Sequence, residues 1–139
     1  MEKKNYKFIL FSVAGEQWAM PLYDNSQFFT CGDLVALPQS DLSIAGLTYH
    51  SGQIITLLNS RNLLSLGLAG APTKRHGLLF SFNGDYYGLL VDEPGETIKA
   101  EHIFTDRSRK IFAKYLKINK QKVYIIEVSD IFEKIHLYD

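Results

Sequence analysis

Two segments of this chain recur further along it, and this repeat restricts the choice of fold more than any other feature. Residues 55–64 match residues 123–132 at an offset of 68 (55 to 123), and both run from an apolar stretch into a short helical one. Residues 8–22 match residues 77–91 at an offset of 69 (8 to 77). Two blocks with nearly the same offset indicate that one structural unit is used twice. We therefore expect one domain, residues 1–139, with a first half over about 1–70 and a second over 71–139.

Each half reads as about five short strands with little helix. The alternation of apolar and β-branched residues with turn residues predicts strands at 8–13, 17–22, 26–30, 53–58, 77–82, 86–91, 96–99 and 114–118. Short helical pieces are expected at 61–66, capped by Asn59 or Ser60, and at 131–136. An open sheet this small leaves its edges unpaired, so closure into small barrels is favoured. The residues expected in the core are Phe11, Leu57, Leu58, Phe80, Ile125 and Ile126.

The composition narrows the classes of function. The 139 residues include 15 basic and 15 acidic side chains, so no net charge draws the whole chain to nucleic acid or an anionic membrane. Cys31 is the only cysteine, which excludes a disulfide framework and favours a reducing, cytoplasmic setting. The apolar run near the N-terminus spans about seven residues, whereas a membrane span needs about 20. We expect a cytoplasmic protein without direct membrane insertion.

No group of residues has the pattern of an active site. The four histidines show no convincing metal-ligand spacing with each other, with a cysteine or with a carboxylate. Asp92 and Glu93 precede Pro94 and Gly95, a turn setting that favours solvated carboxylates over a catalytic pair. Without a nucleophile beside a base, the sequence predicts no enzyme activity, no metal, no cofactor and no small-molecule substrate.

Basic residues gather between Arg107 and Lys122. They are Arg107, Arg109, Lys110, Lys114, Lys117, Lys120 and Lys122, and no acid lies among them. A solvated barrel face explains such a stretch, and so does a contact surface for an acidic protein or for a nucleic-acid backbone. Phe104, Phe112 and Tyr115 lie near these charges, a mixture that single-strand binders use. A nucleic-acid-binding β-barrel is therefore kept as an alternative, although the neutral overall charge argues against it.

Four segments, from about residue 7 to residue 135, resemble the CheW-like domain family of chemotaxis coupling proteins and kinase regulatory domains. They are residues 8–22, 46–64, 80–92 and 123–132. The family commonly reads Gly-Val-x-Asn-Leu-Arg-Gly before an apolar strand. Gly46 and Gly52 stand at its two glycine positions, where we expect a structural turn, and Tyr49, His50 and Ser51 stand at Asn-Leu-Arg.

The resemblance implies an all-β fold of two intertwined small SH3-like β-barrels with short helical connections. It also implies a non-catalytic adaptor that couples a chemoreceptor or other sensor to a two-component histidine kinase. The positions equivalent to the receptor groove are Asn25, Gln27, Tyr49 and Ser51. For the surface that faces the kinase regulatory domain or builds a ring, we assign Phe104 as an exposed apolar anchor, with Arg107 and Arg109 at its rim.

One departure from the family pattern affects the expected partner. An arginine at the position of Ser51 offers five donors that can fix a loop, whereas serine has one short hydroxyl. Asn25 and Gln27 are polar where the family tends to have an apolar residue and an acid. We therefore expect weak or absent binding of an ordinary chemoreceptor tip, with the kinase-facing surface retained. A diverged CheW-like module with another protein partner is the first alternative.

Overall fold

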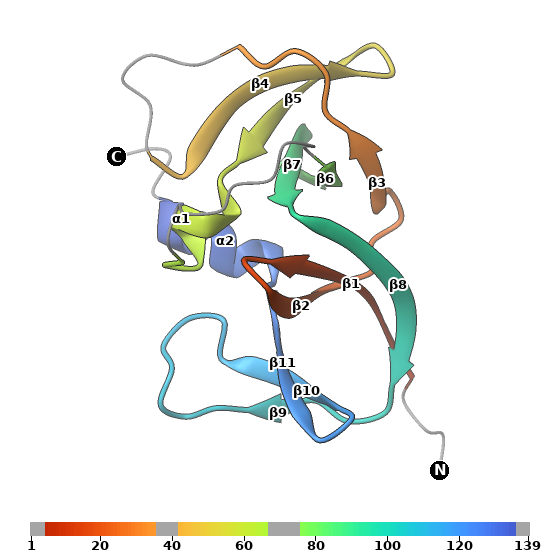
Figure 1. The fold of residues 1–139 in the computed structure, drawn as a ribbon, viewed down its shortest axis with the longest axis vertical. Helices are drawn as coiled ribbons and strands as arrows, with labels where there is room; N and C mark the ends of the chain where they lie inside the picture. The colour runs from red at the N-terminus through yellow and green to blue at the C-terminus, as the bar shows by residue number, and fades with distance from the viewer. Residues whose placement is uncertain (1–4, 36–41, 67–75, 136–139) are drawn as a thin grey trace.

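The computed structural model describes residues 5–35, 42–66 and 76–135, which are mostly β-structure, as the sequence predicts (Figure 1). The strands are β1 Tyr6–Val13, β2 Glu16–Pro21, β3 Gln27–Thr30, β4 Ile44–His50, β5 Gln53–Leu58, β6 His76–Phe82, β7 Asp85–Val91, β8 Glu93–Ala100, β9 Phe104–Thr105, β10 Lys114–Ile118 and β11 Gln121–Ile125. The helices are α1 Ser60–Leu63 and α2 Val128–Ile135. None of the helices in these ranges is long and apolar enough to cross a membrane.

The strands form two sheets that exchange hairpins. Sheet A has the strand order β8-β1-β2-β11-β10-β9, and sheet B has the order β3-β6-β7-β5-β4. The first hairpin of the chain, β1–β2, therefore lies among strands from the end of the chain, while β6–β7 lies among β3, β4 and β5. Figure 1 shows β4 and β5 at the top, β9 to β11 at the bottom, and both helices at one side between them. The predicted all-β fold of two intertwined units is thus confirmed, with each unit present as a sheet.

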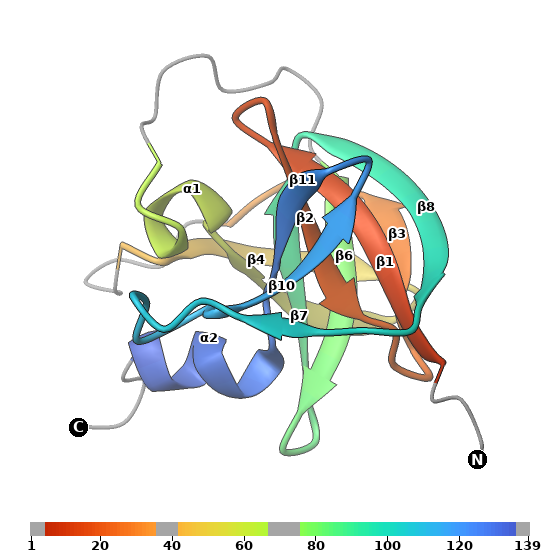
Figure 2. The same cartoon turned by 90° about the horizontal axis from the view of Figure 1, so that it is seen from below.

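Each sheet curls so that the chain beyond one edge strand returns to the other edge. After β8 the chain bends into β9, whose Phe104 pairs with Tyr115 of β10. After β3 the chain reaches Val35, which forms an isolated bridge with Leu47 of β4. Figure 2 shows β8 curving around β1. The sheets are therefore two small, partly open barrels.

Equivalent residues pair in the same way in both sheets. In sheet A, Phe11 of β1 lies opposite Trp18 of β2. In sheet B, Phe80 of β6 lies opposite Tyr87 of β7, and both positions are 69 residues later (11 to 80, 18 to 87). In each sheet the second strand of this hairpin also pairs in parallel with the strand that precedes a helix. The strand pairing thus carries the repeat, whereas the boundary near residue 70 stays a prediction because residues 67–75 lie outside the described ranges.

The two exchanged hairpins turn through the same backbone conformation. Ala14 and Gly15 have φ angles of 53° and 79°, and Asn83 and Gly84 have 52° and 84°. Positive φ at both central residues is typical of the type I′ turn, which suits the right-handed twist of the flanking strands. Asn-Gly favours this turn strongly, whereas alanine in the left-handed region is strained.

The apolar core has three parts, because the central strands are buried on both faces. Along β1, Phe8 and Leu10 pack inside sheet A, while the alternate residues Ile9 and Phe11 pack between the two sheets. A third cluster around Phe29 fills sheet B. The six residues that the sequence places in the core are each at most 1% exposed, which confirms that prediction: Phe11, Leu57, Leu58, Phe80, Ile125 and Ile126.

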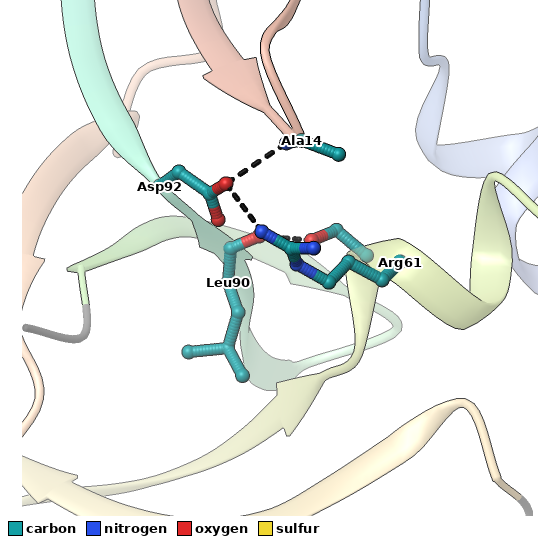
Figure 3. A network of polar contacts seen from close by, with 5 residues as sticks. Ala14, Arg61, Leu90 and Asp92 are labelled. Carbon is teal, nitrogen blue, oxygen red and sulfur yellow. Dashed lines mark hydrogen bonds and ion pairs between the residues drawn. The ribbon is translucent and has the colours of Figure 1, made fainter. Parts of the chain in front are cut away.

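An ion pair between a buried arginine and a half-buried aspartate lies at the junction of the two sheets, and it corrects one expectation. Asp92, expected to be solvated, accepts hydrogen bonds through Oδ2 from Arg61 Nη2 at 2.7 Å and from the Ala14 N–H at 2.8 Å. The Arg61 side chain is only 8% exposed. Beside it, the Ser60 hydroxyl donates to the Leu90 carbonyl (Figure 3). Helix α1, the β7–β8 corner and the β1–β2 turn are thereby tied together.

Three local boundaries also differ from the sequence-based expectations. Pro94 and Gly95 lie inside β8 and not in a turn. A Cβ at Gly95 would lie 2.4 Å from the Leu10 carbonyl oxygen, so this close approach of β8 to β1 requires glycine. Helix α1 begins at Ser60 and ends at Leu63, with Asn59 Oδ1 accepting from the Asn62 N–H as its cap. Helix α2 begins at Val128, three residues before the expected start (131 − 128).

Candidate partner-binding surfaces

The β4–β5 hairpin carries two of the four residues assigned to the receptor groove. His50 pairs with Gln53, and the two residues between them form the turn. Ser51 and Gly52 have φ angles of 49° and 78°, and both are exposed. Because this is again the type I′ conformation, the Ser51 side chain projects from a short, fixed hairpin tip.

Gly46, expected in a turn, lies inside strand β4. Its φ is 152°, and the pairing of β4 with β5 shifts register between Ile44 and Gly46. A Cβ at this position would lie 2.6 Å from the carbonyl oxygen of Val35. The glycine therefore serves a β-bulge and a close backbone approach, not a turn. A glycine at a turn and a glycine at a bulge both appear in a sequence as an isolated glycine, so the sequence alone could not distinguish the two.

Beside the hairpin tip, Tyr49 lines an apolar hollow at the open edge of sheet B. Tyr49 and Ile54, which are paired across β4 and β5, are 70% and 55% exposed. The hollow has a volume of about 440 Å³, and its lining is Asp33, Val35, Leu47, Thr48, Tyr49 and Ile54. Neither Val35 nor Ile54 was predicted as a contact residue. The apolar run at residues 53–58 indicated a buried strand and has no polar–apolar alternation that would mark Ile54 as exposed. Val35 joins the hollow through its bridge to Leu47, a contact that no local pattern predicts.

The other two receptor-groove residues lie at the start of β3. Asn25 belongs to a tight turn in which Ser26 Oγ accepts from the Tyr23 N–H at 2.8 Å, and Gln27 is the exposed first residue of the strand. Two residues later, Phe29 stacks on His50 with ring centroids 4.7 Å apart. This contact brings β3 toward the β4–β5 tip. Among the described residues, however, no hydrogen bond or ring contact joins the two pairs directly, Asn25 and Gln27 on one side and Tyr49 and Ser51 on the other.

The basic segment begins with a loop that one carboxylate organises. Asp106 accepts from the N–H and the hydroxyl of Ser108, at 3.0 and 2.6 Å, and from Tyr124 Oη at 2.7 Å. These hydrogen bonds, the Ser108 hydroxyl first, hold the pKa of Asp106 at about 2. The guanidinium of Arg109 lies 3.9 Å from the centre of the Tyr124 ring. Arg109 is thus held in place, whereas Arg107 is exposed.

Phe104 lies next to this loop but is covered by its neighbours. Its ring stacks on Tyr115 with centroids 5.4 Å apart, and Lys117 Nζ lies 4.7 Å from the centre of the Phe104 ring. Phe104 is half-buried, which does not fit the expected exposed apolar anchor. Phe112, the other phenylalanine of the segment, is 2% exposed and belongs to the core.

Comparison with known proteins supplies the family. The family model described as CheW-like domain matches residues 7–136. The chain belongs to the CheW-like domain family. The sequence-based interpretation as a coupling adaptor of chemotaxis signalling, the role of this family, is thereby confirmed. No curated protein matches the chain.

A solved structure confirms the fold independently. The CheW-like chain is similar to the crystal structure of the scaffolding protein TtCheW from Thermoanaerobacter tengcongensis, with 20% sequence identity and a TM-score of 0.82. The match covers 94% of each chain. At this identity the likeness concerns the fold, so the partner surfaces have to be argued from the residues of this chain.

Proposed function

We propose that this CheW-like chain couples a sensor to the regulatory domain of a two-component histidine kinase, without catalysing a reaction itself. The observation that carries the proposal is the exposed surface of the β4–β5 hairpin, where Tyr49 and Ile54 stand beside an apolar hollow. Exposed aromatic and aliphatic side chains around a hollow are typical of protein contacts. Coupling to such a kinase would place the chain in the cytoplasm.

The residues at the hairpin tip indicate that an ordinary chemoreceptor tip binds weakly. Ser51 is exposed, and its hydroxyl makes no hydrogen bond to the other described residues. An arginine there would reach further and present a planar set of donors. We therefore propose that kinase binding is retained and that receptor binding is weak. A different protein partner for the hairpin is the second candidate, favoured by Tyr49, His50 and Ser51 at the Asn-Leu-Arg positions.

The test compares variants of the full chain in calorimetric titrations with two fragments from the same organism, a chemoreceptor tip and a kinase regulatory domain. We expect the wild type to bind the kinase domain and to bind the receptor tip weakly or not at all. Ser51→Arg should create receptor binding, and Ser51→Lys should not, because lysine supplies charge without the guanidinium fork. Tight receptor binding by the wild type would contradict the role of Ser51.

A second pair of variants tests the hairpin surface itself. Tyr49→Ser should weaken whichever partner the hairpin contacts, by about tenfold or more if Tyr49 is a central contact. Tyr6→Ser is the control, because Tyr6 is also an exposed strand tyrosine, 37% exposed, but lies in sheet A. Failure of both fragments to bind the wild type would refute the coupling function.

A further inference from the structure

One face of sheet A carries a row of aromatic side chains covered by cations. Phe104, Tyr115, Tyr124 and Trp18 lie opposite one another on β9, β10, β11 and β2. Neighbouring ring centroids are 5.4, 5.6 and 6.3 Å apart. The cations follow the rings: Lys117 lies over Phe104, Lys122 over Tyr115 at 4.9 Å, and Arg109 over Tyr124. We call this surface the cation-aromatic face.

Few carboxylates lie near the cations of this face to neutralise their charge. Lys117 and Lys122 lie directly opposite each other on β10 and β11, an arrangement in which like charges repel. Of the seven basic residues between 107 and 122, only Lys114 makes an ion pair within the described ranges, with Glu127 at 3.2 Å. Asp106 is near enough to Lys122 to feel its charge, but its oxygens are taken by Ser108 and Tyr124. The face therefore holds positive charge that an outside acid could neutralise.

A hollow next to the same cations includes Trp18, a residue with a buried donor, in its lining. It has a volume of about 380 Å³, and Trp18, Gln121, Lys122 and Tyr124 are part of its lining. The Trp18 side chain is buried and its indole N–H has no acceptor among the described residues. Glu16 also lines the hollow and is the one acid there. A buried donor without an acceptor is costly, so a ligand that brings acceptor oxygens would gain from this position.

The equivalent surface of sheet B has none of this charge. At an offset of 68, Lys117 and Lys122 correspond to Tyr49 and Ile54 (117 − 68, 122 − 68), and each pair lies directly across its hairpin. Because the strand pairing is the same in both hairpins, the fold itself does not require lysines at these positions. The two lysines are therefore explained by what this surface contacts and not by the needs of the fold.

We propose that the cation-aromatic face binds an acidic segment of a partner protein, whose carboxylates lie between Lys117, Lys122 and Arg109. This deepens the proposed function, on which it rests for the expectation of a protein partner. Single-stranded nucleic acid is the less suitable occupant, because base stacking needs open ring faces. Here the rings of Phe104, Tyr115 and Tyr124 are covered by cations and by each other.

The test uses the full chain and three probes: a short glutamate-rich peptide, its glutamine-rich counterpart and an oligothymidylate of similar length. We expect the glutamate peptide alone to bind, to weaken with added salt and to change the fluorescence of Trp18, the only tryptophan. Lys117→Gln/Lys122→Gln should weaken this binding about tenfold. Lys7→Gln/Lys99→Gln is the matched control, since these exposed lysines also lie opposite each other in sheet A, on β1 and β8.

Three outcomes would count against an acidic-segment site on this face. Equal loss in both double variants, tighter binding of the oligothymidylate, or no binding of the glutamate peptide would overturn the proposal. The kinase and receptor fragments, titrated against the same variants, keep this separate from the proposed function. If the kinase fragment binds the wild type but the glutamate peptide does not, the acidic-segment proposal is wrong and the coupling function stands. If the peptide binds this face and neither fragment binds, the coupling function fails.

Discussion

At the scale of single residues, two carboxylates show how much a local environment decides. Asp92 and Asp106 both follow strand-like segments and look alike in the sequence. Asp92 pairs with a buried arginine at the junction of the sheets, where the low exposure of the guanidinium strengthens the ion pair. Asp106 stays at the surface and is held by hydrogen bonds from Ser108 and Tyr124. The first carboxylate stabilises the fold, and the second arranges the basic loop.

The lowered pKa of Asp106 leads to a prediction for acid stability. Its pKa falls from the ordinary 3.8 to about 2, with the Ser108 hydroxyl as the first cause. The stability it contributes is therefore fully present above 3.8 and is lost as the pH falls toward 2. Ser108→Ala should raise the pKa of Asp106 toward its ordinary value, measured by NMR titration of the carboxyl group, and should reduce stability above this window. Ser81→Ala, at an exposed serine of β6, should change neither quantity. An unchanged Asp106 titration in Ser108→Ala would contradict the assignment.

At the scale of elements, the two equivalent hairpin turns differ in how well their residues suit them. Ala14 holds a φ of 53° where the second turn has Asn83 at 52°. Asparagine tolerates this region better than alanine, so Ala14→Asn should raise the free energy of unfolding by about 0.5–1 kcal/mol. The Ala14 N–H that donates to Asp92 is a backbone group and is kept. Urea unfolding measures the change, and Asn83→Ala should lower stability by a similar amount. A loss of stability in Ala14→Asn, or a gain in Asn83→Ala, would show that φ is not the deciding factor.

Most strand positions followed from the sequence because apolar alternation and turn residues are local signals, but β4 was not among the predicted strands. The hairpin at residues 77–91, with Asn83 and Gly84 at its tip, was predicted nearly to the residue. The bulge at Gly46 and the strand around Gly95 were not, because both depend on a backbone that approaches from elsewhere in the fold. The burial of Phe104 under Lys117 was missed for the same reason. The basic stretch was visible in the sequence, but its aromatic row required the register of four strands.

At the scale of the molecule, the exchange of hairpins makes the two sheets one folding unit. Neither half of the chain can complete a sheet from its own strands, because β1–β2 belongs to sheet A and β6–β7 to sheet B. The largest apolar cluster lies between the sheets and includes Phe11, Met20 and Phe80 together with residues of both helices. The two proposed partner surfaces, the β4–β5 hairpin and the cation-aromatic face, therefore lie on sheets that share one apolar core.

This architecture predicts that damage to one sheet is felt in the other. Leu57 is fully buried inside sheet B, and Leu57→Ala should cost about 2–5 kcal/mol. Trp18 lies in the cluster between the sheets and reports on sheet A by fluorescence, while circular dichroism reports on all strands. Because the hairpins are exchanged, both signals should shift together to lower urea in a single transition. Ile54→Ala, on the same strand but 55% exposed, should shift neither by much. If Trp18 kept its wild-type midpoint while circular dichroism lost amplitude earlier, the sheets would be unfolding separately, and the strand exchange would not couple them.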